Sequence, residues 1–244
     1  MATADDLILS MDRDGIQISV VQNGGWFTHE LCVETNDYIL ESIARYPKKL
    51  IGFCAIQPLA GDRALREIER CAKGGARGIG ELRPDDQGID LGNKEIMDPI
   101  VELVVEHNLL FLTHASEPVG HLYQGKGMVT PGVIYHFLCN YPQLRVICAH
   151  WGGGLPFYAL MPEVRNVLAN TFFDSAASPF LYEPQVYERV SDLVGADKIL
   201  FGTDYPLLRP GRVKAQIDSS RLSKAAKSMI LGGNARKLLY GDLA

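Results

Sequence analysis

Short apolar runs alternate with longer stretches of helical periodicity along the whole chain. The apolar runs predict strands at 16–21, 50–56, 76–81, 109–113, 145–149, 170–173 and 198–201. The stretches between them predict helices at 2–13, 33–46, 63–73, 93–107, 131–141, 155–168 and 183–194, and two or three more within 212–239. Strands that alternate with crossover helices are typical of a parallel sheet covered by helices.

The number of predicted strands is one short of a closed barrel. A closed (β/α)8 barrel has eight strands in about 250 residues. This chain has 244 residues and starts with a helical pattern, so the strand that is missing is the first. We therefore predict an α/β, TIM-like barrel that lacks its first strand, formed by a single domain over residues 1–244.

The missing strand leaves two strand edges without a partner. Unpaired edges favour association with other chains. We expect either that the gap is filled by side chains or by the N-terminal segment, or that another chain covers it. Of these outcomes we favour a homodimer, because an open barrel would leave apolar surface in contact with water.

Four residues with metal-binding side chains stand directly after predicted strands. They are Glu81, His114, His150 and Asp204. In a parallel barrel the carboxyl ends of all strands open onto one face, so these side chains should converge there. Two carboxylates and two imidazoles on one rim are typical of a metal-dependent hydrolase.

Composition narrows the class of protein. The net charge is −5 and no basic run is present, which argues against a nucleic-acid partner. No apolar stretch reaches 18 residues, and the first residues lack the basic segment of a signal peptide, so we expect no membrane partner. The five cysteines are scattered without a C-x-x-C pair, as expected for reduced thiols in a cytoplasmic protein.

Four stretches carry a family resemblance: THASEPVGH at 113–121, CAHWGGG at 148–154, LFGTDYP at 200–206 and GNARKL at 233–238. Together they resemble the amidohydrolase superfamily. The branch they resemble most includes aminocarboxymuconate-semialdehyde decarboxylase, resorcylate decarboxylases and metal-dependent hydrolases. The resemblance covers essentially the whole chain and implies a (β/α)8 barrel that holds a divalent metal, most often zinc.

The resemblance also implies roles for the strand-end residues. His114 and Asp204 match two of the family's metal ligands, and Glu81 stands where two-metal members have a bridging ligand. His150 matches the residue that polarises the substrate or assists the attacking water. The family's His-x-His pair at the end of strand one is absent, since no two histidines here have that spacing. We expect that the natural protein begins upstream of Met1, and that the chain as given binds zinc weakly or not at all.

The expected function is that of a metal-dependent hydrolase acting on a small carboxylated or cyclic substrate. One alternative is a metal-dependent decarboxylase of the same branch, and another is a catalytically impaired barrel. The expected catalytic residues are His150 and Asp204, and the expected metal ligands are His114, Asp204 and Glu81. The residues expected to contact the substrate are Glu117, His121 and Trp151.

Structural interpretations compete with these roles. Glu81 stands two residues before Arg83, with which it could form an ion pair. Asp204 could form a turn or cap a helix. The glycines at 152–154 either let a substrate anion approach the backbone or simply form a tight turn. Asp174 and Ser175 are more typical of turn residues than of ligands.

Overall fold

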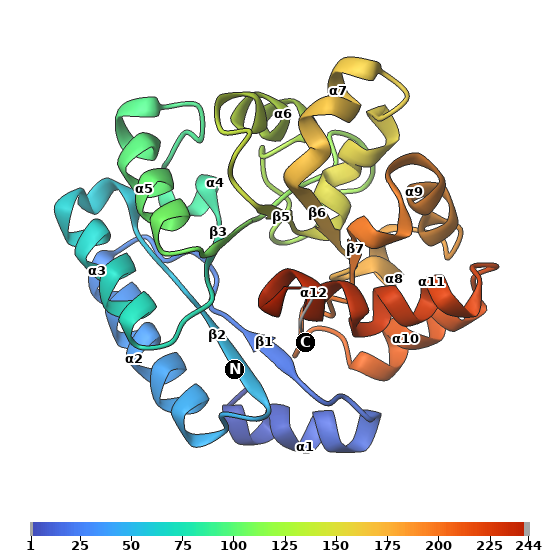
Figure 1. The fold of residues 1–244 in the computed structure, drawn as a ribbon, viewed down its shortest axis with the longest axis horizontal. Coiled ribbons are helices and arrows are strands. Elements are labelled where there is room, and N and C mark those ends of the chain that lie inside the picture. Colours follow the sequence, from blue (N-terminus) through green and yellow to red (C-terminus); the bar gives the residue numbers. More distant parts are fainter. Residues whose placement is uncertain (1, 242–244) are drawn as a thin grey trace.

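The computed structural model describes residues 2–241 and arranges seven parallel strands as a curled half-barrel with helices on its outer side (Figure 1). Neighbours in the sheet are also neighbours along the chain, so every connection is a crossover to the adjacent strand. The strands are β1 (Ser19–Val21), β2 (Leu50–Cys54), β3 (Gly78–Leu82), β4 (Leu110–Thr113), β5 (Val146–Cys148), β6 (Thr171–Asp174) and β7 (Ile199–Leu200). The predicted TIM-like barrel of seven visible strands is confirmed.

The helices have recognisable start and stop signals. The capping box of Thr3 and Asp6 starts α1, and Gly15 ends it in the left-handed conformation. The α-helices are α1 (Ala4–Asp14), α2 (His29–Arg45), α3 (Asp62–Lys73), α4 (Pro84–Gln87), α5 (Lys94–Glu106), α6 (Pro131–Asn140), α7 (Pro162–Val167), α8 (Ser178–Leu181), α9 (Val186–Val194), α10 (Pro210–Ser219), α11 (Lys224–Ser228) and α12 (Asn234–Tyr240).

Two helix predictions were wrong in their bounds. Helix α2 begins at His29, earlier than predicted, because the hydroxyl of Thr28 caps it by accepting from the N–H of Leu31. The helix predicted at 155–168 is replaced by a short 3-10 segment, η2 (His150–Tyr158), followed by α7. The break ends at Met161, which is extended (φ −83°, ψ 119°) because the residue before a proline disfavours the helical conformation, and α7 begins at Pro162.

The core lies on both faces of the central strands. All residues of β2, β3, β4 and β5 are buried. On their outer face, strand side chains such as Ile79 and Phe111 pack against helix side chains such as Phe137 of α6. On the concave side, α12 lies across the strands (Figure 1) and packs Leu238 and Leu239 on a cluster that includes Phe53. Helix α12 therefore covers apolar surface that the incomplete barrel would otherwise expose.

The gap expected from the missing strand is present between β1 and β7, and we call it the seam. Within residues 2–241, no strand pairs with the outer edge of β1 or of β7. Strand β7 has two residues, and Val20 at the centre of β1 is 40% exposed. Helix α1 lies beside the seam, where the backbone carbonyl of Asp6 accepts from the Tyr205 hydroxyl.

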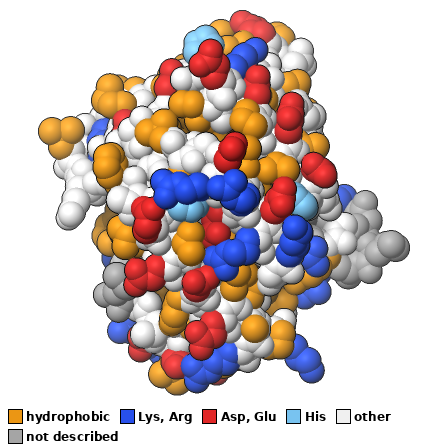
Figure 2. Space-filling model, turned by 90° about the vertical axis from the view of Figure 1, so that its left-hand side faces the viewer, with side chains coloured by type: hydrophobic (Ala, Val, Ile, Leu, Met, Phe, Trp, Pro, Cys, Tyr) orange, Lys and Arg blue, Asp and Glu red, His pale blue; other side chains and the backbone are white. Residues whose placement is uncertain are grey.

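The outer face of α2 and α3 is turned to the viewer in Figure 2, where acidic and basic side chains lie next to one another. Two ion pairs of 2.7 Å, Arg63–Glu30 and Arg70–Asp37, tie α3 to α2. Among the described residues, no helix combines the length and the apolar character needed to cross a membrane.

Candidate metal centre

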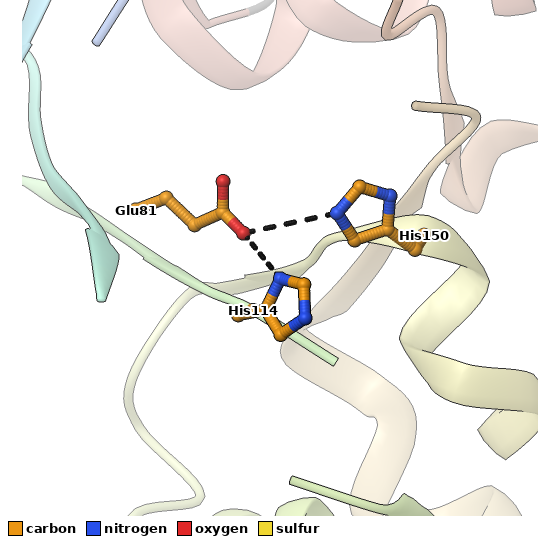
Figure 3. Close-up of side chains that lie close together, drawn as sticks. All are labelled: Glu81, His114 and His150. Atoms are coloured by element: carbon orange, nitrogen blue, oxygen red, sulfur yellow. Dashed lines mark hydrogen bonds and ion pairs between the residues drawn. The ribbon is translucent and has the colours of Figure 1, made fainter. Parts of the chain in front are cut away.

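Three of the four strand-end residues come together at the carboxyl ends of β3, β4 and β5. Figure 3 shows the side chain of Glu81 pointing at the imidazoles of His114 and His150. The Oε1 atom of Glu81 lies 2.7 Å from Nδ1 of His114 and 3.8 Å from Nε2 of His150. One ligand atom from each residue lies within 4.8 Å of the others, and all three side chains are nearly or fully buried.

The position of Glu81 depends on the glycine before it. Gly80 has a φ of 122°, and a Cβ atom there would lie 2.2 Å from the carbonyl oxygen of Leu112 on the neighbouring strand. Only glycine allows this close approach of β3 to β4. The N–H of Glu81 then donates to the carbonyl of Asn23, which ties the end of β3 to the loop after β1.

His150 is held by hydrogen bonds at both its backbone and its ring. Its φ is 54°, and its backbone N–H donates to Oδ1 of Asp174 over 3.0 Å. Its ring atom Nδ1 lies 3.1 Å from the carbonyl oxygen of Ala176. Because a carbonyl only accepts, Nδ1 must carry the hydrogen, and Nε2 is left to face Glu81. This is the arrangement typical of a metal-binding histidine held by a second protein group.

His114 is held in a comparable way by Ser116. The Nε2 atom of His114 lies 3.2 Å from Oγ of Ser116, which also accepts from the N–H of Gly127. This hydroxyl therefore joins the histidine to the far end of the loop that follows β4. Neither Ser116 nor Ala176 was predicted from the sequence. The spacing His-x-Ser was a usable signal for the first, whereas a backbone carbonyl such as that of Ala176 leaves no trace in a sequence.

Electrostatics favour opposite charges on Glu81 and His150. Burial raises the pKa of Glu81, but the contacts with His114 and His150 outweigh it and hold the pKa well below the usual range. Burial lowers the pKa of His150, but the contact with Glu81 and the charges of Glu81 and Asp174 raise it to about 10. Without a metal, a proton on His150 therefore balances the carboxylate, and this is the charge that a bound cation would replace.

The two remaining carboxylates have different positions. Asp204, after β7, is exposed at the seam, yet it is near enough for its charge to act on His150. Although the residue as a whole is exposed, neighbouring protein atoms partly desolvate its carboxyl and raise the pKa of that group. Asp174 accepts from the backbone N–H groups of His150 and Ala176, and burial raises its pKa to about 6. Asp174 thus shapes the turn beside the site, as its turn-residue interpretation anticipated.

The donor set fits a divalent cation. A carboxylate oxygen and two imidazole nitrogens are the ligands that protein sites offer to zinc and related metals, and catalytic sites commonly use three of them. The expectation of weak binding assumed only His114, Asp204 and Glu81 as donors. In the structure Nε2 of His150 joins Glu81 and His114 in the converging set, which does not include Asp204, so three converging ligands remain without the His-x-His pair.

The three residues expected to contact substrate lie outside this cluster. Trp151 is 0% exposed, donates its indole N–H to Ser178 and packs against Tyr187. It is therefore a core residue and not, as expected, one that faces a substrate. Glu117 accepts from the Tyr123 hydroxyl in the loop after β4. His121 is exposed farther along that loop. The roles of Glu117 and His121 stay predictions.

The glycines after His150 form a tight turn. Gly152, Gly153 and Gly154 all have positive φ. A Cβ atom on Gly153 would lie 2.3 Å from the carbonyl oxygen of Ser116. The turn after β5 therefore packs directly on the backbone that carries the Ser116 hydroxyl.

Comparison with known proteins finds decarboxylases among the relatives of this chain. The gamma-resorcylate decarboxylase of Polaromonas sp. (strain JS666) is 24% identical over 277 residues, covering 96% of this chain and 82% of that protein. The 2-amino-3-carboxymuconate-6-semialdehyde decarboxylase of Dictyostelium discoideum is 24% identical, covering 98% of this chain and 77% of that protein.

Among solved structures, the dihydroxybenzoic acid decarboxylase of Polaromonas sp. JS666, with bound manganese and the inhibitor 2-nitroresorcinol, superposes with a TM-score of 0.78. The two chains are 19% identical over 98% of this chain and 86% of that one, so this likeness concerns the fold. The sequence profile of the amidohydrolase family matches residues 2–240. The carboxyl ends of β3, β4 and β5 carry a candidate divalent-metal site, and the chain belongs to the amidohydrolase family of enzymes.

Proposed function

We propose that this chain is a metal-dependent decarboxylase of small aromatic or unsaturated carboxylic acids. The observation that carries the proposal is the convergence of Glu81, His114 and His150 at the carboxyl ends of three adjacent strands. The relatives from Polaromonas sp. and Dictyostelium discoideum are both decarboxylases, and each matches nearly the whole length of this chain. They favour decarboxylation over the hydrolysis that the sequence first indicated.

In this proposal Glu81, His114 and His150 hold the metal ion. When bound, the ion supplies positive charge that orients an anionic substrate and stabilises charge that builds up on it. Manganese is the first ion to test because a structural relative contains it, and zinc is the second. The hydrogen bonds from His114 to Ser116 and from His150 to Ala176 fix the two imidazole rings so that the site is organised before the substrate arrives.

Asp204 is proposed as the proton donor. Decarboxylation replaces a carboxylate on carbon with hydrogen, so a proton must reach that carbon. The raised pKa of Asp204 favours a protonated carboxyl. The Asp204 carboxyl transfers its proton to this carbon, which forms the new C–H bond. The C–C bond to the carboxylate then breaks. The electron pair of that C–C bond returns to the substrate as CO2 leaves. Because Asp204 is exposed at the seam, solvent can supply the next proton.

The test is a direct assay of CO2 release. The purified chain is treated with a chelator and reloaded with Mn2+ or Zn2+, then incubated with 2,6-dihydroxybenzoate and with other hydroxylated benzoates. We expect metal-dependent release of CO2 with one of these acids, and none from the chelator-treated protein. Metal-dependent opening of lactones or amides without any CO2 release would instead support the hydrolase alternative.

The assembly of the chain is a separate part of the proposal. We propose a homodimer that covers the unpaired edge of β1, because Val20 and Ile18 expose apolar surface there. Sedimentation velocity at micromolar concentration tests this, and a monomer would contradict it.

A further inference from the structure

A cavity of about 460 Å³ lies at the seam, between α1 and the loop after β7. We call it the seam cavity. It is lined by Ala2, Asp6, Leu9, Ser10, Arg13, Tyr205, Pro206 and Arg209. None of these residues belongs to the three-residue metal cluster. The volume is within the range of pockets that hold small organic ligands.

Two guanidinium groups line this cavity, and they differ in how far they are neutralised. Within the described residues, Arg209 has no hydrogen-bond or ion-pair partner for its guanidinium. Arg13 donates to the buried hydroxyl of Ser10 over 3.2 Å, and it lies 3.6 Å from the carboxylate of Asp14. Arg209 is therefore the stronger attractor of an anion, and Arg13 is an assisting one.

Asp6 is the acidic residue in the lining, and its carboxylate already has hydrogen-bond partners. Asp6 accepts hydrogen bonds from the backbone N–H and the hydroxyl of Thr3 at the start of α1. These bonds hold the pKa of the Asp6 carboxyl below its usual value, so it stays ionised and bound to the helix terminus. Asp6 reduces the positive charge of the seam cavity but does not pair with Arg209.

The rest of the lining is suited to a flat apolar group. The ring of Tyr205, the ring of Pro206 and the side chain of Leu9, which is 70% exposed, form its apolar wall. The Tyr205 hydroxyl is directed to the backbone of α1, where it donates to the carbonyl of Asp6. A planar guanidinium binds carboxylates in a two-pronged manner, and an aromatic ring stacks on flat apolar side chains.

We propose that the seam cavity binds a small aromatic carboxylate, with its carboxylate on Arg209 and Arg13 and its ring against Leu9, Tyr205 and Pro206. This inference does not depend on the proposed decarboxylase activity, because binding at the seam needs neither a metal nor turnover. An aromatic acid is the ligand class that uses both the charged and the apolar parts of the lining. A purely inorganic anion would use only the arginines.

The experiment is isothermal titration of the chelator-treated chain with benzoate and, separately, with inorganic phosphate. Chelation removes any contribution from anions bound to a metal ion. The variants are Arg209→Gln, Arg13→Gln and Leu9→Ser, and the matched control is Arg66→Gln. Arg66 is an exposed arginine on α3, outside the lining of the cavity. Arg209 is exposed and unpaired, so its replacement should leave the fold intact, which circular dichroism checks.

We expect saturable binding of benzoate that weakens about tenfold or more in Arg209→Gln, since a charged hydrogen bond is removed. Arg13→Gln should weaken it less, because Asp14 already neutralises part of that charge. Leu9→Ser should weaken benzoate but not phosphate, and Arg66→Gln should change neither. No saturable binding of benzoate, phosphate bound as tightly as benzoate, or equal losses in Arg66→Gln and Arg209→Gln would each overturn the proposal.

Discussion

Strands β2 to β5 and the seam between β7 and β1 differ in how completely their residues are packed. Every residue of the four central strands is buried between the outer helices and α12. At the seam, β1 is half exposed and β7 has only two residues. The three converging donor atoms belong to the packed side, whereas Asp204 belongs to the seam. A site that needs fixed distances is therefore supported where the core is complete, and the seam contributes a group that solvent can reach.

The largest expected effect separates metal binding from the seam. His114→Ala removes one of three donors on the packed side, so we expect Mn2+ affinity to fall by at least about 100-fold, more than is typical for the loss of a residue that only orients a ligand. Asp204→Asn, at the seam, should change Mn2+ affinity by less than about fivefold, because Asp204 does not belong to the three-donor cluster. Titration of Mn2+ followed by electron paramagnetic resonance measures both. Equal losses of Mn2+ affinity in the two variants would contradict the difference between the packed strands and the seam.

Truncating one side chain in each region compares how much the two regions contribute to the free energy of unfolding. Phe53 is 1% exposed on the concave side of β2, and Val20 is 40% exposed on β1. We expect Phe53→Ala to lower the free energy of unfolding by about 3–5 kcal/mol through loss of burial and formation of a cavity. Val20→Ala should lower it by less than about 0.5 kcal/mol, as for most surface positions. Urea denaturation followed by tryptophan fluorescence gives both values. Both values apply to the monomer, so unfolding is measured at a protein concentration low enough to dissociate a dimer. A large loss in monomeric Val20→Ala would contradict the difference between the two regions.

A glycine pair tests the contact between the loops that hold the two histidines. Gly153→Ala places a Cβ atom against the Ser116 carbonyl at a positive φ, so we expect a loss of about 2–3 kcal/mol. The control, Gly132→Ala in α6, meets only open space near Thr130 and should be neutral or stabilising by up to about 1 kcal/mol. Thermal unfolding checks the signs. Tolerance of Gly153→Ala would indicate that the turn after β5 is free to move.

The smallest effect concerns pH and a buried carboxylate far from the seam. Burial raises the pKa of Glu67, but hydrogen bonds from Arg70 and Asn36 outweigh it and lower the pKa below its usual value. A lowered pKa in the folded state stabilises the fold above the unfolded value, about 4.3 for glutamate. This contribution is lost as the pH falls through the folded pKa. We expect Glu67→Gln to lose about 1 kcal/mol at pH 7 and less at pH 3. Urea unfolding at both pH values measures the difference, and an equal loss at both would contradict it.

The sequence predicted the parallel fold because each strand is a compact apolar run flanked by helix signals. It also placed Glu81, His114 and His150 at one rim, since barrel geometry brings strand ends together. It did not predict that His150 supplies a donor atom, because the tautomer depends on the carbonyl of Ala176. It misjudged Trp151, since an aromatic residue beside a site residue looks the same in sequence whether it turns to the pocket or to the core.

The place at which a metal ion binds distinguishes most directly between the packed side of the barrel and the seam. Crystals of the chain grown with Mn2+ can be measured at the manganese absorption edge, and an anomalous difference map locates the ion without assumptions about its ligands. We predict one peak, in contact with Glu81, His114 and His150. No peak at millimolar Mn2+, or a peak held at the seam by Asp204 without any of these three residues, would contradict the assignment of the metal to the packed side of the barrel.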